Sequence, residues 1–243
     1  MNPAIVRAAR VAVLAGVLVP TVFTATAEAA TPGQAVAGPG WNLISPTKTT
    51  SLAPGTYTIE FDSTAARTKL TPYLKLSAAN TQKLTPGVKF VVSATLQKRV
   101  TTGCQKARTI VVSLEYRPLG KAGYSQGGNC FNNADHSLWS GFMRIDTEWF
   151  YPHWFSKTAS TNTYRIRNSI THEVGHAIGL GHPNKDLNHD GVVKDYECPL
   201  NKDKTRPLMC SPNGGAVTSV GAGKYTPLDV PGVKALVANY QYR

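Results

Sequence analysis

The chain has 243 residues, of which 42% are hydrophobic and 16% charged, so it can bury a sizeable core and is not a disordered polymer of low hydrophobicity. Its 26 Lys and Arg residues outnumber its 14 Asp and Glu residues, which gives a formal net charge of +12. These basic residues stand in ones and twos without interleaved aromatic residues, a pattern that argues against nucleic-acid binding. We expect a monomer that binds no nucleic acid and folds as one domain, or as one domain in two lobes.

Residues 1–29 have the features of an export signal. Arg7 and Arg10 precede an apolar run that is too short to span a bilayer, and Ala27-Glu28-Ala29 fits the small-x-small rule for signal-peptide cleavage. The sequence therefore predicts a signal peptide over residues 1–29 and a secreted, extracellular protein with no stable membrane insertion. The alternative is that this run stays uncleaved as a membrane anchor.

The chain contains four cysteines, an even number that indicates two disulfides in an oxidising compartment. The gaps between them are too wide for a zinc ribbon, which uses C-x2-C pairs. Three connectivities are possible, and the nearest-neighbour one is favoured. It pairs Cys104 with Cys130 and Cys198 with Cys210.

The first predicted elements follow a stretch without periodicity. Residues 30–54 are rich in Gly, Pro, Thr and Ser, which predicts a linker or short pro-segment without secondary structure. Apolar and polar residues then alternate from Tyr57 to Phe61, as in a half-buried strand. Helical spacing follows from Leu70 to Ala78, with Pro72 in the first turn of the helix, where proline is tolerated.

Further strands are expected downstream. Two β-branched runs, at 88–96 and 109–116, predict strands because Pro-Gly, Gly-Cys and Arg-Pro pairs bound them. Residues 120–137 are expected to form a long loop, and alternation returns from 142 to 150. A polar turn at 156–162 should precede the next helix. The pattern therefore mixes strands and helices, without an internal repeat.

The segment from residue 164 to 178 is predicted to be an amphipathic helix. Its β-branched apolar residues recur every four positions from Ile166 to Ile178 and form one stripe. His172 and His176 are also four positions apart, so both imidazoles project from one face, roughly opposite Val174 of the stripe. We expect the stripe to pack into the core while the two histidines face a cleft.

The spacing of these histidines suits a catalytic zinc ion. Two histidines one helical turn apart can supply two nitrogen ligands at about 2.0–2.1 Å from Zn²⁺. Gly179 can end the helix in a left-handed conformation and turn the chain so that His182 returns as the third ligand. Three neutral protein ligands leave the fourth position for water, which the Glu173 carboxylate can reach from its place beside His172.

The string from residue 172 to 182 reads H-E-x-x-H-x-x-G-x-x-H and resembles the signature of the metzincin zinc endopeptidases at every fixed position. The resemblance implies that His172, His176 and His182 are zinc ligands. It implies that Glu173 is the general base, which activates water and then passes its proton to the leaving amine. It also implies that Met209 belongs to the methionine turn beneath the metal.

The end of the chain is similar to the matrixins within this family. Residues 228–236 resemble the entry to the C-terminal helix of those enzymes. Ser211 stands where astacins and serralysins have an additional tyrosine ligand, so no such ligand is expected here. The sequence also shows no cysteine-switch pro-segment.

The expected fold is mixed α+β and metzincin-like. Residues 55–182 would form an upper lobe with a sheet, two helices and the catalytic motif. Residues 183–243 would form a smaller, irregular lower lobe with the methionine turn, ending in a helix. The active cleft would run between the two lobes.

A protein or peptide substrate is expected to bind in this cleft in extended form. An edge strand near residues 141–146 would align it by strand addition. Residues 211–225 would form the wall of the specificity pocket. Four large aromatic residues upstream could line the cleft, although packing in the core is the ordinary expectation for such residues; these are Trp139, Trp149, Trp154 and Phe155.

The predicted function is a secreted zinc-dependent endopeptidase that hydrolyses peptide bonds through zinc-activated water. A secreted zinc-containing protein that binds or inhibits without turnover is the alternative from another class, and the intact Glu173 argues against it. A further alternative keeps the enzyme but makes Glu197 the third zinc ligand in place of His182.

A second metal motif lies between the third histidine and the methionine turn. Residues 186–197 fit D-x-[DN]-x-[DN]-G-x5-E, in which oxygen ligands surround Ca²⁺ and Gly191 permits a sharp bend. Two features oppose this reading, namely Lys194 inside the loop and Cys198-Pro199, which prevents the usual exiting helix. The alternative is a solvated, Asx-rich turn. The candidate calcium ligands are Asp186, Asn188, Asp190, the Val192 carbonyl and Glu197.

Overall fold

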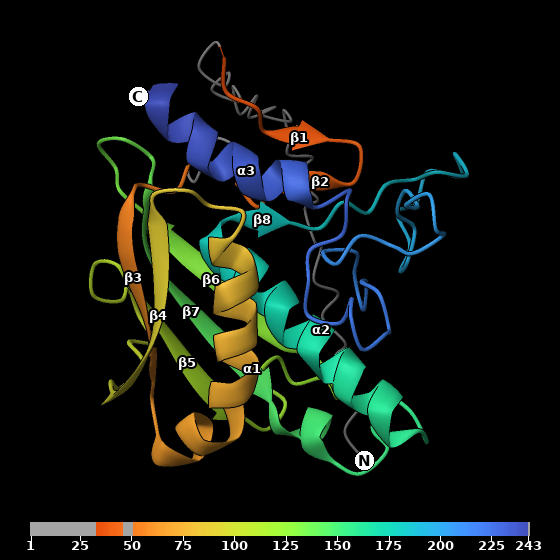
Figure 1. Cartoon of the computed structure of the whole chain (residues 1–243), viewed down its shortest axis with the longest axis horizontal. Helices are drawn as coiled ribbons and strands as arrows, with labels where there is room; N and C mark the ends of the chain where they lie inside the picture. The colour runs from red at the N-terminus through yellow and green to blue at the C-terminus, as the bar shows by residue number, and fades with distance from the viewer. Residues whose placement is uncertain (1–32, 46–50, 243) are drawn as a thin grey trace, which may run out of the picture.

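The computed structural model describes residues 33–45 and 51–242. It has the mixed α+β architecture that the sequence predicts, with two long helices packed on a five-stranded sheet (Figure 1). The predicted signal peptide lies outside the described residues. In the part of the chain that is described, no helix is both long enough and apolar enough to cross a membrane.

The five-stranded sheet has the order β4-β3-β5-β7-β6. Its strands are β3 (Gly55–Phe61), β4 (Val88–Leu96), β5 (Thr109–Glu115), β6 (Gln126–Phe131) and β7 (Leu138–Asp146). All neighbours pair in parallel except β6, which runs antiparallel to β7 and forms one edge of the sheet. Parallel pairs need crossover connections, and α1 supplies the one between β3 and β4.

Helix α1 (Thr64–Gln82) begins earlier than the sequence suggested, because Ser63 caps it by accepting a hydrogen bond from the Ala66 amide (3.2 Å). Pro72 therefore lies inside the helix and not in its first turn. Proline removes the donor for the carbonyl four residues earlier, that of Thr68. Thr68 and Pro72 are both exposed, so water can bind this carbonyl.

Strand β6 lies within residues 120–137, which the sequence predicted to be a loop. Its Gly127-Gly128-Asn129 sequence is typical of a turn, but here Gly127 allows β6 to approach the helix that carries Glu173 and His176. A β-carbon at Gly127 would collide with the carbonyl oxygen of Glu173 and lie 2.7 Å from the β-carbon of His176. The edge strand thus packs directly against the helix that carries the histidines.

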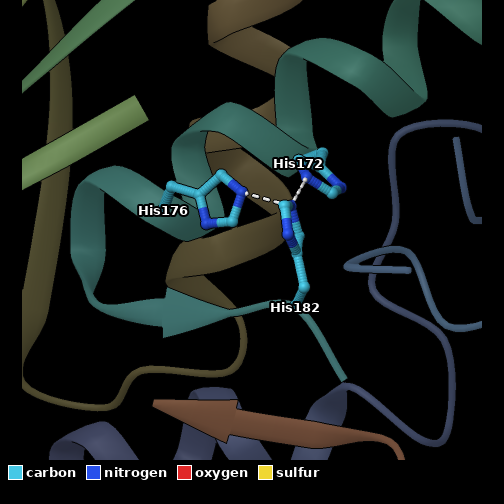
Figure 2. Close-up of side chains that lie close together, drawn as sticks. All are labelled: His172, His176 and His182. Carbon is cyan, nitrogen blue, oxygen red and sulfur yellow. Dashed lines mark hydrogen bonds between the residues drawn. The ribbon is translucent and has the colours of Figure 1, made fainter. Parts of the chain in front are cut away.

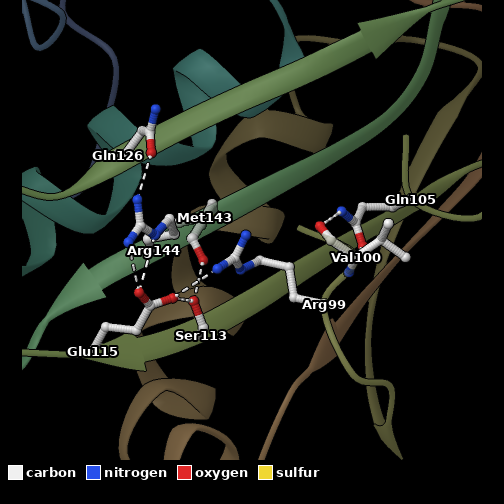
Figure 3. Close-up of polar contacts among 8 residues, drawn as sticks. All are labelled: Arg99, Val100, Gln105, Ser113, Glu115, Gln126, Met143 and Arg144. Carbon is white, nitrogen blue, oxygen red and sulfur yellow. Dashed lines mark hydrogen bonds and ion pairs between the residues drawn. The ribbon is translucent and has the colours of Figure 1, made fainter. Parts of the chain in front are cut away.

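The edge of the sheet is β6 and not the segment 141–146, which belongs to β7 and lies between β5 and β6. An ionic network links these three strands (Figure 3). Arg144 donates to Glu115 Oε2 (3.0 and 2.8 Å) and to Gln126 Oε1 (3.1 Å). Burial alone would raise the pKa of Glu115, but hydrogen bonds from Arg144 and Ser113 hold it below its ordinary value.

The stretch predicted to be a linker contains two short strands, so that prediction of an element-free segment is wrong. β1 (Ala37–Gly38) and β2 (Trp41–Leu43) form an antiparallel hairpin, and β2 pairs with β8 (Leu180–Gly181) (Figure 1). Trp41 and Leu43 are buried in the hydrophobic core. This part of the chain is therefore integrated into the fold.

Helix α2 (Ala159–Ile178) starts inside the stretch 156–162 that was predicted to be a turn. Its apolar stripe is buried as predicted, from Ile166 to Ile178. The one-turn helix η1 (Thr147–Phe150) precedes it along the chain.

The chain beyond β8 is largely irregular. Within the described residues it forms no helix or strand until α3 (Val230–Ala238), which the 3-10 helix η2 (Asn239–Tyr242) follows. Figure 1 shows α3 lying against the β1-β2 hairpin.

Two disulfides join Cys104 to Cys130 and Cys198 to Cys210, the nearest-neighbour pairing that the sequence favoured. The first connects the loop before β5 to the edge strand β6. The second connects the irregular chain after β8 to the residue that follows Met209.

Candidate metal centre

The histidine cluster begins on α2 and is completed just beyond it. His172 and His176 lie on the last two turns of the helix and are buried. Gly179 ends the helix in the left-handed region (φ 117°), and its amide donates to the carbonyls of Gly175 and His176 (both 3.1 Å). The short strand β8 follows, and it delivers His182 back to the helical pair (Figure 2).

The three imidazoles meet through their Nε2 atoms. The Nε2 of His182 lies 3.0 Å from that of His172 and 2.9 Å from that of His176. On their other side the two helical rings face carbonyl oxygens, His172 Nδ1 that of Leu208 (2.9 Å) and His176 Nδ1 that of Leu180 (2.7 Å). These carbonyls fix the protons on Nδ1 and leave the Nε2 lone pairs directed at the centre of the cluster.

This arrangement fits a bound metal ion better than a set of hydrogen bonds. His182 Nε2 can donate at most one proton, so it cannot satisfy the lone pairs of both His172 and His176. A tetrahedral Zn²⁺ with nitrogen ligands at about 2.0–2.1 Å requires them to be about 3.3 Å apart, close to the separations found here. Among the described residues, this is the group of three His, Cys, Asp or Glu ligand atoms that lie within 4.8 Å of one another.

The histidines are held neutral by their surroundings. Burial lowers the pKa of His172 well below its ordinary value and that of His176 to about 3. His182 is exposed as a residue, and partial desolvation lowers its pKa as well. A neutral imidazole is the form that ligates a metal.

Glu173 lies beside the cluster with an unused carboxylate oxygen. Its side chain is buried, and its Oε2 accepts no hydrogen bond within the described residues. Burial raises the pKa of Glu173 to about 8, and a hydrogen bond with the Gly127 backbone partly opposes this rise. A buried, unpartnered carboxylate oxygen is costly unless water, a proton or a cation meets it.

Met209 lies beneath the helix that carries the histidines. Its Sδ packs on Gly175, where any β-carbon would collide with the sulfur. Asp229, which is fully buried, accepts hydrogen bonds from the amides of Leu208 (2.7 Å) and Met209 (3.0 Å). The same Leu208 offers its carbonyl to His172, so this turn both supports the helix and orients one of its histidines.

A cavity of about 570 Å³ opens next to the histidines. His172, Glu173, His176 and His182 line it. Four aromatic residues also line it, Tyr124, Trp149, Trp154 and Phe155, and so do Ser211, Pro212 and Asn213.

Three of the aromatic residues fulfil both roles that the sequence allowed them. Trp149, Trp154 and Phe155 line the cavity as well as packing on the core, whereas Trp139 is exposed. The expected wall segment 211–225 lines the cavity only at its start. An aromatic residue in the core and one that also lines a cavity are equally hydrophobic. The sequence therefore could not show which of the aromatic residues line the cavity.

Two buried carboxylates hold the cavity wall in place. Asp146 and Glu148 both accept a hydrogen bond from the Gly123 amide (2.8 and 3.0 Å), and the Arg117 guanidinium donates twice to Glu148 (2.9 and 2.8 Å). The indole of Trp149 donates to the Gly123 carbonyl (2.9 Å). The loop before β6 is therefore anchored where it meets the cavity.

The loop 186–197 is exposed, and its carboxylates are engaged by its own backbone. Asp186 accepts from the amides of Asp190 (3.1 Å) and Gly191 (2.8 Å). Glu197 accepts from three amides at distances of 2.7, 3.1 and 3.0 Å, those of Leu187, Asn188 and Lys194.

The remaining candidate calcium ligands behave in the same way. Asn188 Oδ1 accepts from the Asp190 amide (3.1 Å), and Asp190 accepts from the Val192 amide (3.1 Å) and pairs with the Lys194 ammonium. That ammonium lowers the pKa of Asp190. The structure thus gives calcium no support, and Lys194 supplies the positive charge there.

The structure brings together His172, His176 and His182, with Glu173 beside them, Gly179 in the turn and Met209 below. Glu197 stays in its own loop, so the alternative that made it the third ligand of the helical pair is not what the geometry favours.

Known proteins share little sequence with this chain. No protein-family model and no curated protein matches it. Among solved structures it is similar to high choriolytic enzyme 1, a hatching-enzyme zinc protease from the medaka fish Oryzias latipes, with 12% sequence identity and a TM-score of 0.39. That match covers 83% of this chain and 100% of the other. A likeness this weak carries no argument about function, which has to be built from the site itself.

Proposed function

We propose that this chain is a secreted zinc endopeptidase of the metzincin type. One observation carries the proposal, namely that three histidine Nε2 atoms meet at an open cavity that Glu173, whose buried Oε2 has no hydrogen-bond partner, also lines. A structural zinc site is closed by a fourth protein ligand, and no further His, Cys, Asp or Glu joins this group among the described residues. The open position suits a site for water and substrate.

Secretion is part of the proposal. The signal-peptide pattern of residues 1–29 supports it, and so do the two disulfides, because such bonds persist in oxidising compartments.

The chemistry divides between the metal and the chain. Zn²⁺ held by His172, His176 and His182 would supply Lewis acidity, which polarises a peptide carbonyl and lowers the pKa of water. Glu173 accepts the proton of the attacking water at Oε2 and delivers it to the nitrogen of the leaving amine. The carbonyls of Leu208 and Leu180 hold the two helical imidazoles in the ligating tautomer throughout.

The substrate is a protein or peptide in extended form. β6 is the last strand in the order of the five-stranded sheet, and an extended peptide can add beside such an edge strand. The cavity next to the cluster, about 570 Å³ in volume, has room for a side chain of that peptide, and its lining includes aromatic residues and residues 211–213.

The testing experiment separates catalysis from metal binding. The wild-type protein should bind one zinc per chain and digest casein, and a chelator should abolish digestion. Glu173→Gln keeps the size of the side chain and every metal ligand but removes the proton acceptor. We expect activity to fall by about 10²–10⁴-fold, the usual contribution of a general acid or base, while zinc content is unchanged.

Two results would count against the proposal. A Glu173→Gln variant that keeps more than a tenth of the activity would contradict the role of Glu173. A wild-type protein that binds zinc tightly but digests no casein or peptide would favour the non-catalytic binding protein instead.

A further inference from the structure

The three residues that lead from α2 to His182 are bound on one side by the N-terminal hairpin. β2 pairs antiparallel with β8, with Asn42 opposite Gly181 and Leu43 opposite Leu180. The next amide of the hairpin strand, that of Ile44, donates to the Gly179 carbonyl (2.8 Å). Residues 42–44 thus pair with the whole turn from Gly179 to Gly181.

The hairpin is itself firmly attached to the rest of the fold. Trp41 and Leu43 are buried, and the indole of Trp41 packs directly on Gly232 of α3. At the start of the hairpin, the Asn239 side chain accepts from the Ala35 amide (3.0 Å) and donates to the Ala35 carbonyl (2.8 Å). The hairpin is therefore held between α3 on one side and β8 on the other (Figure 1).

Strand β8 controls two of the three histidines. Leu180 faces β2 through its pairing with Leu43, and its carbonyl accepts the hydrogen bond from His176 Nδ1 (2.7 Å). Gly181 leads directly into His182. A displaced β8 would therefore move one histidine and release the partner that fixes the tautomer of another.

A turn with two glycines in three residues has many conformations when nothing holds it. If β8 were free, metal binding would have to order it. With β2 paired to it, the turn is already in the ligating geometry before the metal arrives, which is the general effect of supporting interactions around a metal site.

We propose that residues 37–44 are a permanent part of the metal centre, which position His182 and the Leu180 carbonyl and are retained in the active enzyme. They act as positioning residues and touch no reacting atom. This inference rests on the proposed zinc-peptidase function, and it decides against a pro-segment that is discarded on activation, one of the two roles that the sequence suggested for residues 30–54.

The test removes one backbone hydrogen bond without touching the core. The Ile44 side chain is 42% exposed, so it can be replaced with little effect on packing. Ile44→Pro abolishes the amide that donates to Gly179, whereas Ile44→Ala keeps that amide and serves as the matched control. Both variants lose the same side chain from the cavity wall, so any difference between them reports the backbone bond.

Metal binding is the main readout. Zinc transfer to a chromogenic chelator should show about 10–100-fold weaker binding for Ile44→Pro, as is usual when a partner that supports a metal ligand is lost, and unchanged binding for Ile44→Ala. The visible spectrum of the Co²⁺-substituted protein should change only in the proline variant, because it reports ligand geometry. A role limited to general stability would lower the melting temperature and leave that spectrum unchanged.

A second variant covers the case in which Ile44→Pro does not fold. A β-carbon at Gly181 would lie 2.8 Å from Asn42 Oδ1 and 3.1 Å from the Leu43 carbonyl oxygen. Gly181→Ala should therefore displace the Asn42 side chain and shift the backbone of β2 slightly away from β8, and weaken zinc binding in the same way. The amino-terminal residue of the active, zinc-loaded wild-type enzyme should lie at or before position 37.

Each other outcome is decisive. Equal zinc affinity and equal Co²⁺ spectra in the folded variants would overturn the inference and leave the proposed function intact. So would an active, zinc-loaded form that begins after residue 44. A wild-type protein that binds no zinc at the histidines would instead overturn the proposed function, and this inference with it.

Discussion

Two segments of this chain carry metal-binding motifs, and they differ in how their ligand atoms are satisfied. In the string 172–182, three neutral imidazoles converge with lone pairs that no donor can fill together. In the loop 186–197, the carboxylates accept hydrogen bonds from their own backbone and from Lys194. Ligand spacing is equally good in both sequences. The comparison teaches that a motif requires a cation only when nothing else in the fold can meet its ligand atoms.

The largest effect is expected from removing the third zinc ligand. Each segment contains one candidate for it, His182 in the string and Glu197 in the loop. His182→Ala should abolish both zinc binding and proteolysis, because two histidines alone cannot hold a catalytic zinc. Glu197→Gln should leave zinc content and proteolysis near those of the wild type. Metal analysis of the purified variants, paired with casein digestion, makes the measurement. Zinc that follows Glu197 rather than His182 would reverse the comparison.

A smaller effect is expected from removing the disulfide that ties the end of the loop to the turn around Met209. The disulfide between Cys198 and Cys210 spans 12 residues and joins the loop to the methionine turn. Replacing both cysteines with serine should lower the free energy of unfolding by about 2–4 kcal/mol, the usual contribution of a native disulfide. Urea unfolding measures this loss. The folded double variant should still bind one zinc per chain, since no ligand is removed, and loss of zinc from it would show that the two segments are not independent.

The smallest effect is expected from calcium. Millimolar Ca²⁺ should leave the melting temperature of the wild type unchanged at fixed zinc, because Lys194 already occupies the place of a cation beside Asp190. In Lys194→Ala the uncompensated carboxylates should make the melting temperature sensitive to Ca²⁺. Scanning calorimetry of both proteins, with Ca²⁺ and with a Ca²⁺-selective chelator, tests this. Stabilisation of the wild type by Ca²⁺ would restore the loop as a calcium site.

The helix that carries the histidines could be predicted from sequence because two independent patterns agree there. The apolar stripe fixes its buried face, and the spacing of His172 and His176 fixes the other. Gly179 then signals the turn, and the structure places it in the left-handed region as expected. These signals can be read from a short stretch of sequence, because helical periodicity and the turn at Gly179 relate residues that are near one another in the chain.

The elements that were missed depend on contacts between distant parts of the chain. β1 and β2 have two and three residues, too few for alternation to be visible, and they exist because β8 and α3 bind them. In β6, position 127 is a glycine because α2 leaves no room for a side chain there. That glycine made the segment look like a turn in the sequence. Pro72 was read as a helix start, and only the capping of α1 by Ser63 shows otherwise. Sequence patterns record local preference and do not show which surfaces will meet.

The contact between Gly175 and Met209 bears on which substitutions this chain can accept over evolutionary time. The usual notation of the histidine string writes position 175 as a free choice, yet the methionine sulfur occupies the space of its β-carbon. A library randomised at position 175 and selected for folded protein should be enriched in glycine, because any other residue requires the Met209 side chain to move. A search for distant relatives of this chain would therefore gain selectivity by weighting glycine at the second free position of the string H-E-x-x-H-x-x-G-x-x-H.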